Sequence, residues 1–127
     1  MPGAHEIYSY AGGGLVTTTK KIKEKRDEIK RVIKASIKAS QYVKTNADGT
    51  IQVYMALRRM DRETAEGSYA FLSKAINADG SLPEQGFRLL IEEIRDSIKL
   101  SRDVSFDEVS DLSILRETQR ELGIKEK

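Results

Sequence analysis

Acidic side chains are the residues of this sequence most easily imagined in catalysis. They form two close groups, Asp61 with Glu63 and Glu66, and Glu92 with Glu93 and Asp96. General acid–base catalysis needs carboxyl groups inside a pocket that separates their pKa values. Both groups fall on predicted helix caps or exposed helix faces, and no serine or threonine has a histidine base in a recognisable pattern. We therefore expect no enzymatic activity, no catalytic residues and no cofactor.

The glycine run "AGGG" could in principle hold a phosphate. A phosphate-binding loop needs a lysine and then Ser or Thr directly after its last glycine, but Leu15 and Val16 follow here. The dinucleotide-binding motif needs glycines that open a helix, whereas "GGGLVTTT" is typical of an extended segment. We interpret Gly12, Gly13 and Gly14 as a turn or hinge, because glycine adopts positive φ angles without strain.

Two further features could bind ions. His5 is the single histidine and has no cysteine or paired carboxylate at ligand spacing, so we expect no metal site. Arg58, Arg59 and Arg62 could bind an anion, but cations also occur at helix ends simply because they interact favourably with the helix dipole. We prefer the second interpretation, and the ligand-binding residues remain unknown.

The pattern of apolar residues predicts one mainly α-helical domain over residues 1–127. Strand-favouring residues on both sides of the glycines predict a β hairpin or crossover at 5–19, and helical periodicity predicts a body of five helices at 23–124. The longest helix carries an apolar stripe from Ile29 to Val43. Four caps are expected for the others, at Asp48, Asp61, Ser81 with Glu84 as a capping box containing Pro83, and Asp111. The helix after Pro83 carries an apolar face from Phe87 to Ile98, and we expect Phe106 and Val109, in the connecting segment that follows, to dock onto the body of the protein. The last helix should end at Gly123.

Charge is unevenly distributed along the chain. Residues 1–44 contain ten Lys and Arg against four Asp and Glu, a balance of +6, and the remainder contains twelve against sixteen, a balance of −4. A basic segment can bind nucleic acid, but the stretch from Lys20 to Lys38 has no interleaved aromatic residues that could stack on bases. We expect no nucleic-acid partner, although steeply salt-dependent binding would indicate one.

Several motifs are more informative in series than alone. They are "GLVTTTKKIKEKRDEIKRVIKASIKASQYVKTNADGTIQVYM", "MDRETAEGSYAFLSKAINADGSLPEQGFRLLIEE" and "VSFDEVSDLSILRETQRELGI", over residues 14–124. In this order they resemble the carboxy-terminal part of periplasmic substrate-binding proteins of ABC transporters. The subgroup is the nitrate/sulfonate/taurine type, which includes relatives that bind a thiamine pyrimidine precursor.

The resemblance implies capture of a small solute and its transfer to a membrane permease, by binding and hinge closure without chemistry. It also implies a periplasmic or other extracytoplasmic location, although no signal peptide is recognisable in this chain. A complete family member is more than twice as long and has two α/β lobes, so the chain resembles the return crossover, near Gly12 to Gly14, and the helices that follow. Its solute-binding loops do not map onto these residues.

A fragment of a two-lobe fold should expose apolar residues. We expect this of Ile33, Ile37, Phe87, Ile91 and Ile94, and hence a homodimer, possibly with exchanged segments. The alternative is a helical protein-interaction module that associates with itself and has no solute site.

Overall fold

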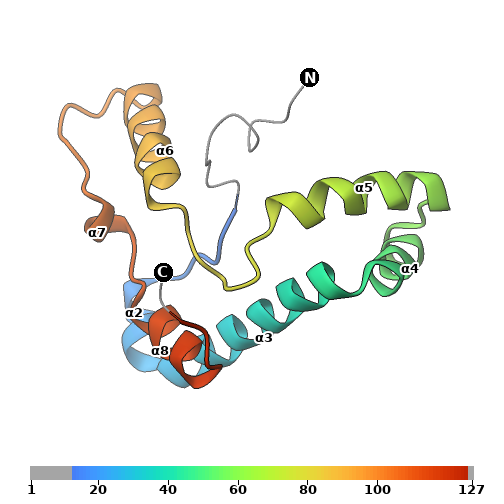
Figure 1. The fold of residues 1–127 in the computed structure, drawn as a ribbon. Helices are drawn as coiled ribbons and strands as arrows, with labels where there is room; N and C mark the ends of the chain where they lie inside the picture. Colours follow the sequence, from blue (N-terminus) through green and yellow to red (C-terminus); the bar gives the residue numbers. More distant parts are fainter. Residues whose placement is uncertain (1–12, 126–127) are drawn as a thin grey trace.

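The protein is described by a computed structural model, which places residues 13–125. This part of the chain is helical, as predicted, and contains seven α helices joined by short segments (Figure 1). They are α2 (Thr19–Glu24), α3 (Arg26–Thr45), α4 (Ala47–Arg58), α5 (Arg62–Ala75), α6 (Glu84–Ser97), α7 (Phe106–Val109) and α8 (Ser113–Glu121). The five expected helices correspond to α3, α4, α5, α6 and α8, while α2 and α7 are additional.

The amino-terminal hairpin is not present in the described part of the chain. Residues 13–18 form neither helix nor strand, and Thr19 already begins α2. The reason is visible at Thr18, whose hydroxyl accepts a hydrogen bond from the backbone N–H of Lys21 at 3.1 Å. A threonine is favoured in strands but is equally suited to an N-cap, and the cap prevails here. The rest of the expected hairpin, residues 5–12, lies outside the described residues.

The long helix α3 carries the predicted stripe, in which Ile37 is buried, Ile29, Ile33 and Val43 are half-buried and Val32 is exposed. Asp27 and Glu28 lie in its first turn and Lys44 in its last, which matches the charge preference of a helix dipole. Its N-cap is Lys25, whose φ of −131° and ψ of 36° interrupt the helical path between α2 and α3. α3 is therefore a separate helix of 20 residues that spans one side of the molecule.

The predicted caps have mixed outcomes. Asp61 caps α5 as expected, since its carboxylate accepts the N–H of Thr64 at 2.9 Å. The cap of α4 is Asn46, which accepts the N–H of Gly49 at 2.8 Å, so the prediction of Asp48 was wrong. Asp48 lies in the first turn, because helix α4 starts at Ala47, immediately after α3 ends.

The predicted capping box before α6 does not form. The N-cap position of α6 is Pro83, without a side-chain hydrogen bond, and Glu84 is the first helical residue. Before α8, Asp111 accepts the N–H of Ser113 at 2.9 Å, but the N-cap position itself is Leu112. Helix α8 ends at Glu121. Gly123 follows with a φ of +70°, which agrees with the glycine expected at the end of this helix.

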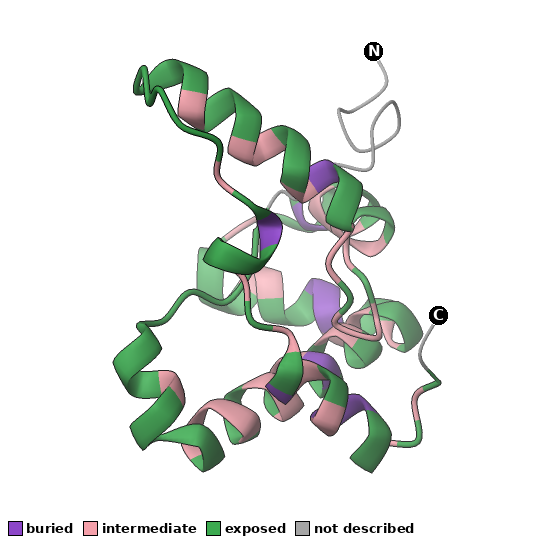
Figure 2. Cartoon of the chain, turned by 90° about the vertical axis from the view of Figure 1, so that its left-hand side faces the viewer, coloured by how far each residue is buried: buried purple, intermediate pink, exposed green. Residues whose placement is uncertain are grey.

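One packed region lies where α3, α8 and the α5–α6 loop meet, and buried residues also occur elsewhere in the chain (Figure 2). Ile37 is 1% exposed, and Ile114 and Thr118 of α8 are also buried. Gly80 brings the loop backbone against Ile37, and Gln119 donates a hydrogen bond from Nε2 to the carbonyl oxygen of Asp79 at 2.8 Å. These contacts hold residues far apart in the sequence together.

A second buried group consists of Thr50 and Ile51 of α4 and Ala65 of α5. α4 packs on α5, whereas the helix that packs on α6 is the short α7, through Phe87 and Phe106 with ring centroids 5.6 Å apart. Phe106 is buried, as expected, but Val109 is 50% exposed. Of the five residues expected to be exposed, Ile94 is exposed and Ile33, Phe87 and Ile91 are half-buried. The prediction was wrong for Ile37, because α8 and the loop cover it.

Candidate functional site

The glycine run lies outside the packed regions. Gly13 and Gly14 are exposed, in a segment without helix or strand, and a Cβ atom added at either would have no neighbouring atom within 4 Å. Gly12 lies outside the described residues. The surroundings of Gly13 and Gly14 leave this segment free to bend, but they offer no wall that could hold a ligand.

The three arginines occupy a helix end, as their position in the sequence suggested. Arg58 ends α4, Arg59 adopts a left-handed conformation with a φ of 53°, and Arg62 begins α5. Arg62 forms an ion pair with Glu66 at 2.7 Å and a longer one with Asp48 at 3.7 Å. Arg62 is therefore engaged by two carboxylates, one from its own helix and one from α4.

The carboxylate groups do not share a pocket either. The N–H of Thr64 holds the pKa of Asp61 below its usual range, which is the effect of a helix cap. Glu92 and Glu93 are exposed on α6, and Asp96 pairs with Arg95 at 3.0 Å. Of these carboxylates, Glu92 lines the cleft described next, in which Asp103 is the other acidic residue.

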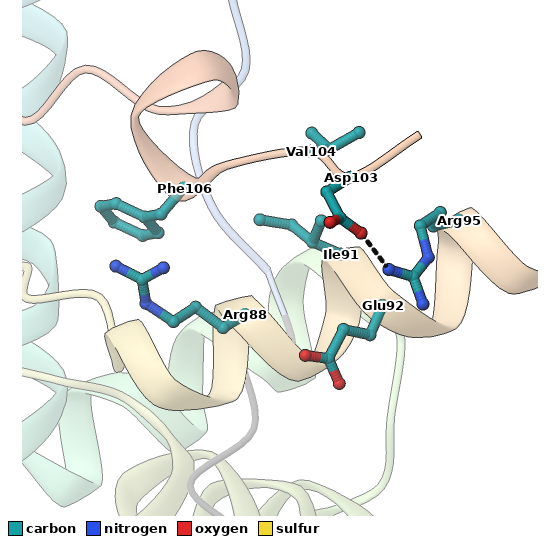
Figure 3. Close-up of a pocket in the computed structure, with 7 residues that line it drawn as sticks. All are labelled: Arg88, Ile91, Glu92, Arg95, Asp103, Val104 and Phe106. Carbon is teal, nitrogen blue, oxygen red and sulfur yellow. Dashed lines mark hydrogen bonds and ion pairs between the residues drawn. The ribbon is translucent and has the colours of Figure 1, made fainter. Parts of the chain in front are cut away.

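A cleft of about 300 Å3 lies between α6 and the segment that leads into α7 (Figure 3). Ile91, Val104 and Phe106 form its apolar wall, and the charged residues Arg88, Glu92, Arg95 and Asp103 complete the lining. The α6 residues are one or two turns apart on the same helix, so that their side chains reach the same space. Opposite α6, Val104 comes from the end of the α6–α7 loop and Phe106 is the first residue of α7.

Ion pairs shape the electrostatics of this cleft. Arg95 binds Asp96 and, across the cleft, Asp103 at 2.8 Å, and these carboxylates raise the pKa of the guanidinium above its already high value. Arg88 lies 5.3 Å from the centre of the Phe106 ring and pairs with Glu84 at 2.6 Å. The cleft thus combines an apolar wall with opposite charges, an arrangement that suits a small solute with both apolar and polar parts.

The sequence could identify only half of this cleft. Ile91 belongs to the predicted stripe of α6, and Phe106 was expected to dock onto the body of the protein. Asp103 lies in a segment without periodicity, so its approach to Arg95 depends on the path of the loop. The sequence around a charged residue in such a loop does not indicate which residue it will pair with.

A second charged cluster joins α3 to α8. Arg26 and Lys30 of α3 contact Glu117 of α8 at 2.9 and 2.5 Å. Lys30 also pairs with Glu121, which Lys34 approaches at 3.7 Å. Three cations of the basic stretch therefore face carboxylates of the acidic end of the chain. The opposite charges of the two parts of the chain therefore attract α3 and α8 to one another.

This cluster predicts a dependence of stability on pH. Lys30 lowers the pKa of Glu117 and Glu121, and Arg26 adds to the effect on Glu117. A carboxyl group with a lowered folded pKa stabilises the fold above the unfolded value of about 4.3, and this contribution is lost as the pH falls through the folded pKa. The raised pKa of Lys30, caused first by Glu117, adds stability that is lost only in alkaline solution.

The measurement is the urea midpoint of unfolding, monitored by circular dichroism, for the wild type and for the double variant Glu117→Gln/Glu121→Gln. We expect a lower urea midpoint for the variant at pH 7 and no difference near pH 2, where the wild-type carboxylates are protonated as well. The difference should shrink at high salt, because these side chains are partly exposed. Glu92→Gln is the control, since Glu92 forms no ion pair with another described residue. An equal difference at both pH values would contradict this assignment.

Residues 13–125 contain neither a metal-binding cluster nor a membrane-spanning helix. Within this range no group of three or more His, Cys, Asp or Glu side chains is arranged to bind a metal ion. The helices described here also lack the combination of length and apolar character needed to cross a membrane. Comparison of the chain with protein-family models, with curated proteins and with solved structures finds no match.

Proposed function

We propose that this chain is a solute-binding component, or the helical part of one, of an ABC-type import system, and that it binds a small solute without chemistry. The observation that carries the proposal is the ordered series of motifs over residues 14–124. Each motif coincides with a helix or its start: "KRDEIKRVIKA" with α3, "NADGTI" with α4, "DRETA" with α5, "LPEQG" with α6 and "LRETQRELG" with α8. The series therefore has a structural meaning beyond composition.

Within this proposal, the cleft between α6 and α7 is the place in this chain for a solute contact. Its apolar wall can exclude water from one side of a solute, while the Arg95–Asp103 pair offers a donor and an acceptor at the rim. The segment with Gly13 and Gly14 supplies the bend that hinge closure needs.

The test is a thermal-shift and calorimetric titration of the protein with nitrate, taurine, an alkyl sulfonate and an aminopyrimidine. A true solute at 100 times its dissociation constant should stabilise the fold by about 2.7 kcal/mol. Val104→Trp, which fills the cleft, should abolish this stabilisation, whereas Val109→Trp, on an exposed position of α7, should retain it. No stabilisation by any of these compounds, in a protein with the helicity expected from the structure, would contradict the proposal.

A second candidate function is a helical protein-interaction module. It is favoured by the distribution of apolar residues, because twelve large ones are exposed among the described residues while only five hydrophobic residues are buried. Folded monomers seldom expose large contiguous apolar patches, so such a surface suggests contact with another protein. This candidate predicts association without any stabilisation by small solutes.

A further inference from the structure

The cleft between α6 and the segment that leads into α7 contains one charged side chain without a partner. Glu92 lines this cleft, and its carboxylate forms no ion pair or hydrogen bond with another described residue. Figure 3 shows Glu92 on α6 between Arg88 and Arg95, with no dashed contact to either of them. Its two oxygen atoms are therefore available to accept hydrogen bonds from a ligand.

The two cations of the cleft, in contrast, are already balanced by carboxylates. Arg95 donates from Nε and Nη2 to Oδ1 of Asp96 at 3.1 and 3.0 Å, and from Nη1 to Oδ1 of Asp103 at 2.8 Å. Arg88 donates from Nε and Nη2 to Oε1 of Glu84 at 3.0 and 2.6 Å. An anionic solute would have to compete with these carboxylates for either guanidinium group.

The charges in and around the cleft give a negative balance. The lining contains two arginines and two carboxylates, Glu92 and Asp103. The ion-pair partners of the arginines, Glu84 and Asp96, add two more carboxylates. Two positive charges therefore stand against four negative ones, a balance of −2. The field of such a group attracts a cation and repels an anion.

We propose that the solute of this cleft is a small organic cation, with an ammonium group attached to an apolar body. The apolar body contacts Ile91, Val104 and Phe106, and the ammonium group, which has only N–H donors, donates hydrogen bonds to Glu92. Nitrate and an alkyl sulfonate, which carry only negative charge, should bind more weakly than an amine. This inference rests on the proposed solute binding and names the class of solute.

The test is a titration of the protein with three probes that share an aromatic body and differ in charge, followed by chemical shifts of the backbone amides in NMR. The probes are benzylamine, which is a cation at pH 7, benzyl alcohol, which is neutral, and benzoate, which is an anion. Shifts should occur at Val104 and Phe106. The dissociation constant of benzylamine should be about threefold to tenfold lower than that of benzyl alcohol, and benzoate should bind most weakly. The difference should shrink at high salt, because Glu92 is exposed.

Two matched variants locate the charge that selects the cation. Glu92→Gln should raise the dissociation constant of benzylamine to that of benzyl alcohol, because the amide keeps the shape of the side chain without its charge. Glu93→Gln makes the same change of net charge at the next residue, which is exposed, lies about 100° further around the helix and does not line the cleft. The preference for the amine should remain in Glu93→Gln.

The outcomes separate this inference from the proposed function. Equal binding of the amine and the alcohol, or equal effects of Glu92→Gln and Glu93→Gln, would overturn the choice of a cation and leave solute binding in place. Tighter binding of benzoate, abolished by Val104→Trp, would do the same. Binding of none of the three probes would overturn this inference, while the titration with the compounds named above decides the proposed function by itself.

Discussion

Replacement of Ile37 by alanine should lower the free energy of unfolding by about 2–5 kcal/mol. Ile37 is the most deeply buried large aliphatic side chain among the described residues, at 1% exposed. It contacts the backbone of Gly80, and Leu115 of α8 approaches the same glycine. Removal of its side chain therefore leaves a cavity where three segments meet, and surrounding atoms can fill it only in part.

The measurement is urea denaturation at a fixed protein concentration. Ile37→Val is the graded control and should cost about 0.5–1.5 kcal/mol, because it removes a single methylene group. Val32→Ala, at a half-exposed position of the same helix, should cost much less than Ile37→Ala. Equal losses for Val32→Ala and Ile37→Ala would contradict the position of the core.

Replacement of Gly80 by alanine should destabilise the protein by about 2–4 kcal/mol for two separate reasons. The φ angle of Gly80 is +74°, in the left-handed region that residues with a Cβ atom seldom adopt. In addition, an added Cβ would lie 2.9 Å from Cγ1 of Ile37 and 3.2 Å from Cδ1 of Leu115. Both neighbours are part of the packed region, so neither can move freely.

A matched control and a double variant separate these two causes. Gly67 lies inside α5, with no atom within 4 Å of an added Cβ, so Gly67→Ala should stabilise the protein by about 0.5–1 kcal/mol. In Ile37→Ala/Gly80→Ala the steric conflict is relieved but the backbone strain remains. The double variant should therefore lose less stability than the sum of the two single variants. If the stability losses of the two single variants add up to that of the double variant, the side chain of Ile37 is not the cause of the steric conflict at Gly80.

The repeated motif in this sequence illustrates how local sequence directs the chain. Residues 46–50 read Asn-Ala-Asp-Gly-Thr and residues 77–81 read Asn-Ala-Asp-Gly-Ser. The first copy starts α4 at once, with Asn46 as the cap, while the second forms a turn and α6 starts only at Glu84. Pro83 explains the difference. A helix that began at Ala78 would need the missing N–H of Pro83, and the proline ring would clash with the carbonyl group of Asp79.

The candidate cleft and the contact between α3 and α8 show what lies beyond local sequence. The apolar stripes of α3, α6 and α8 follow from helical periodicity. The docking of Phe106 was predicted from its apolar character in a connecting segment, and Phe106 is buried. The pairing of Arg95 with Asp103, and of Lys30 with Glu117, joins residues with no fixed relation in the sequence. Equally, Thr18 was expected in a strand but caps α2, because a threonine suits both roles and the local sequence does not decide between them.

The sequence by itself determined the helical character, the cap at Asp61 and the glycine stop after α8, since these depend on contacts within a few residues. Only the tertiary structure decided that Ile37 is buried, that Gly80 must remain a glycine and that the basic and acidic ends of the chain meet at α3 and α8. These features depend on which helices approach one another. That choice is governed by the burial of apolar area over the whole chain. The hydrophobic effect is non-directional, so an apolar stripe in the sequence does not specify which helix will cover it.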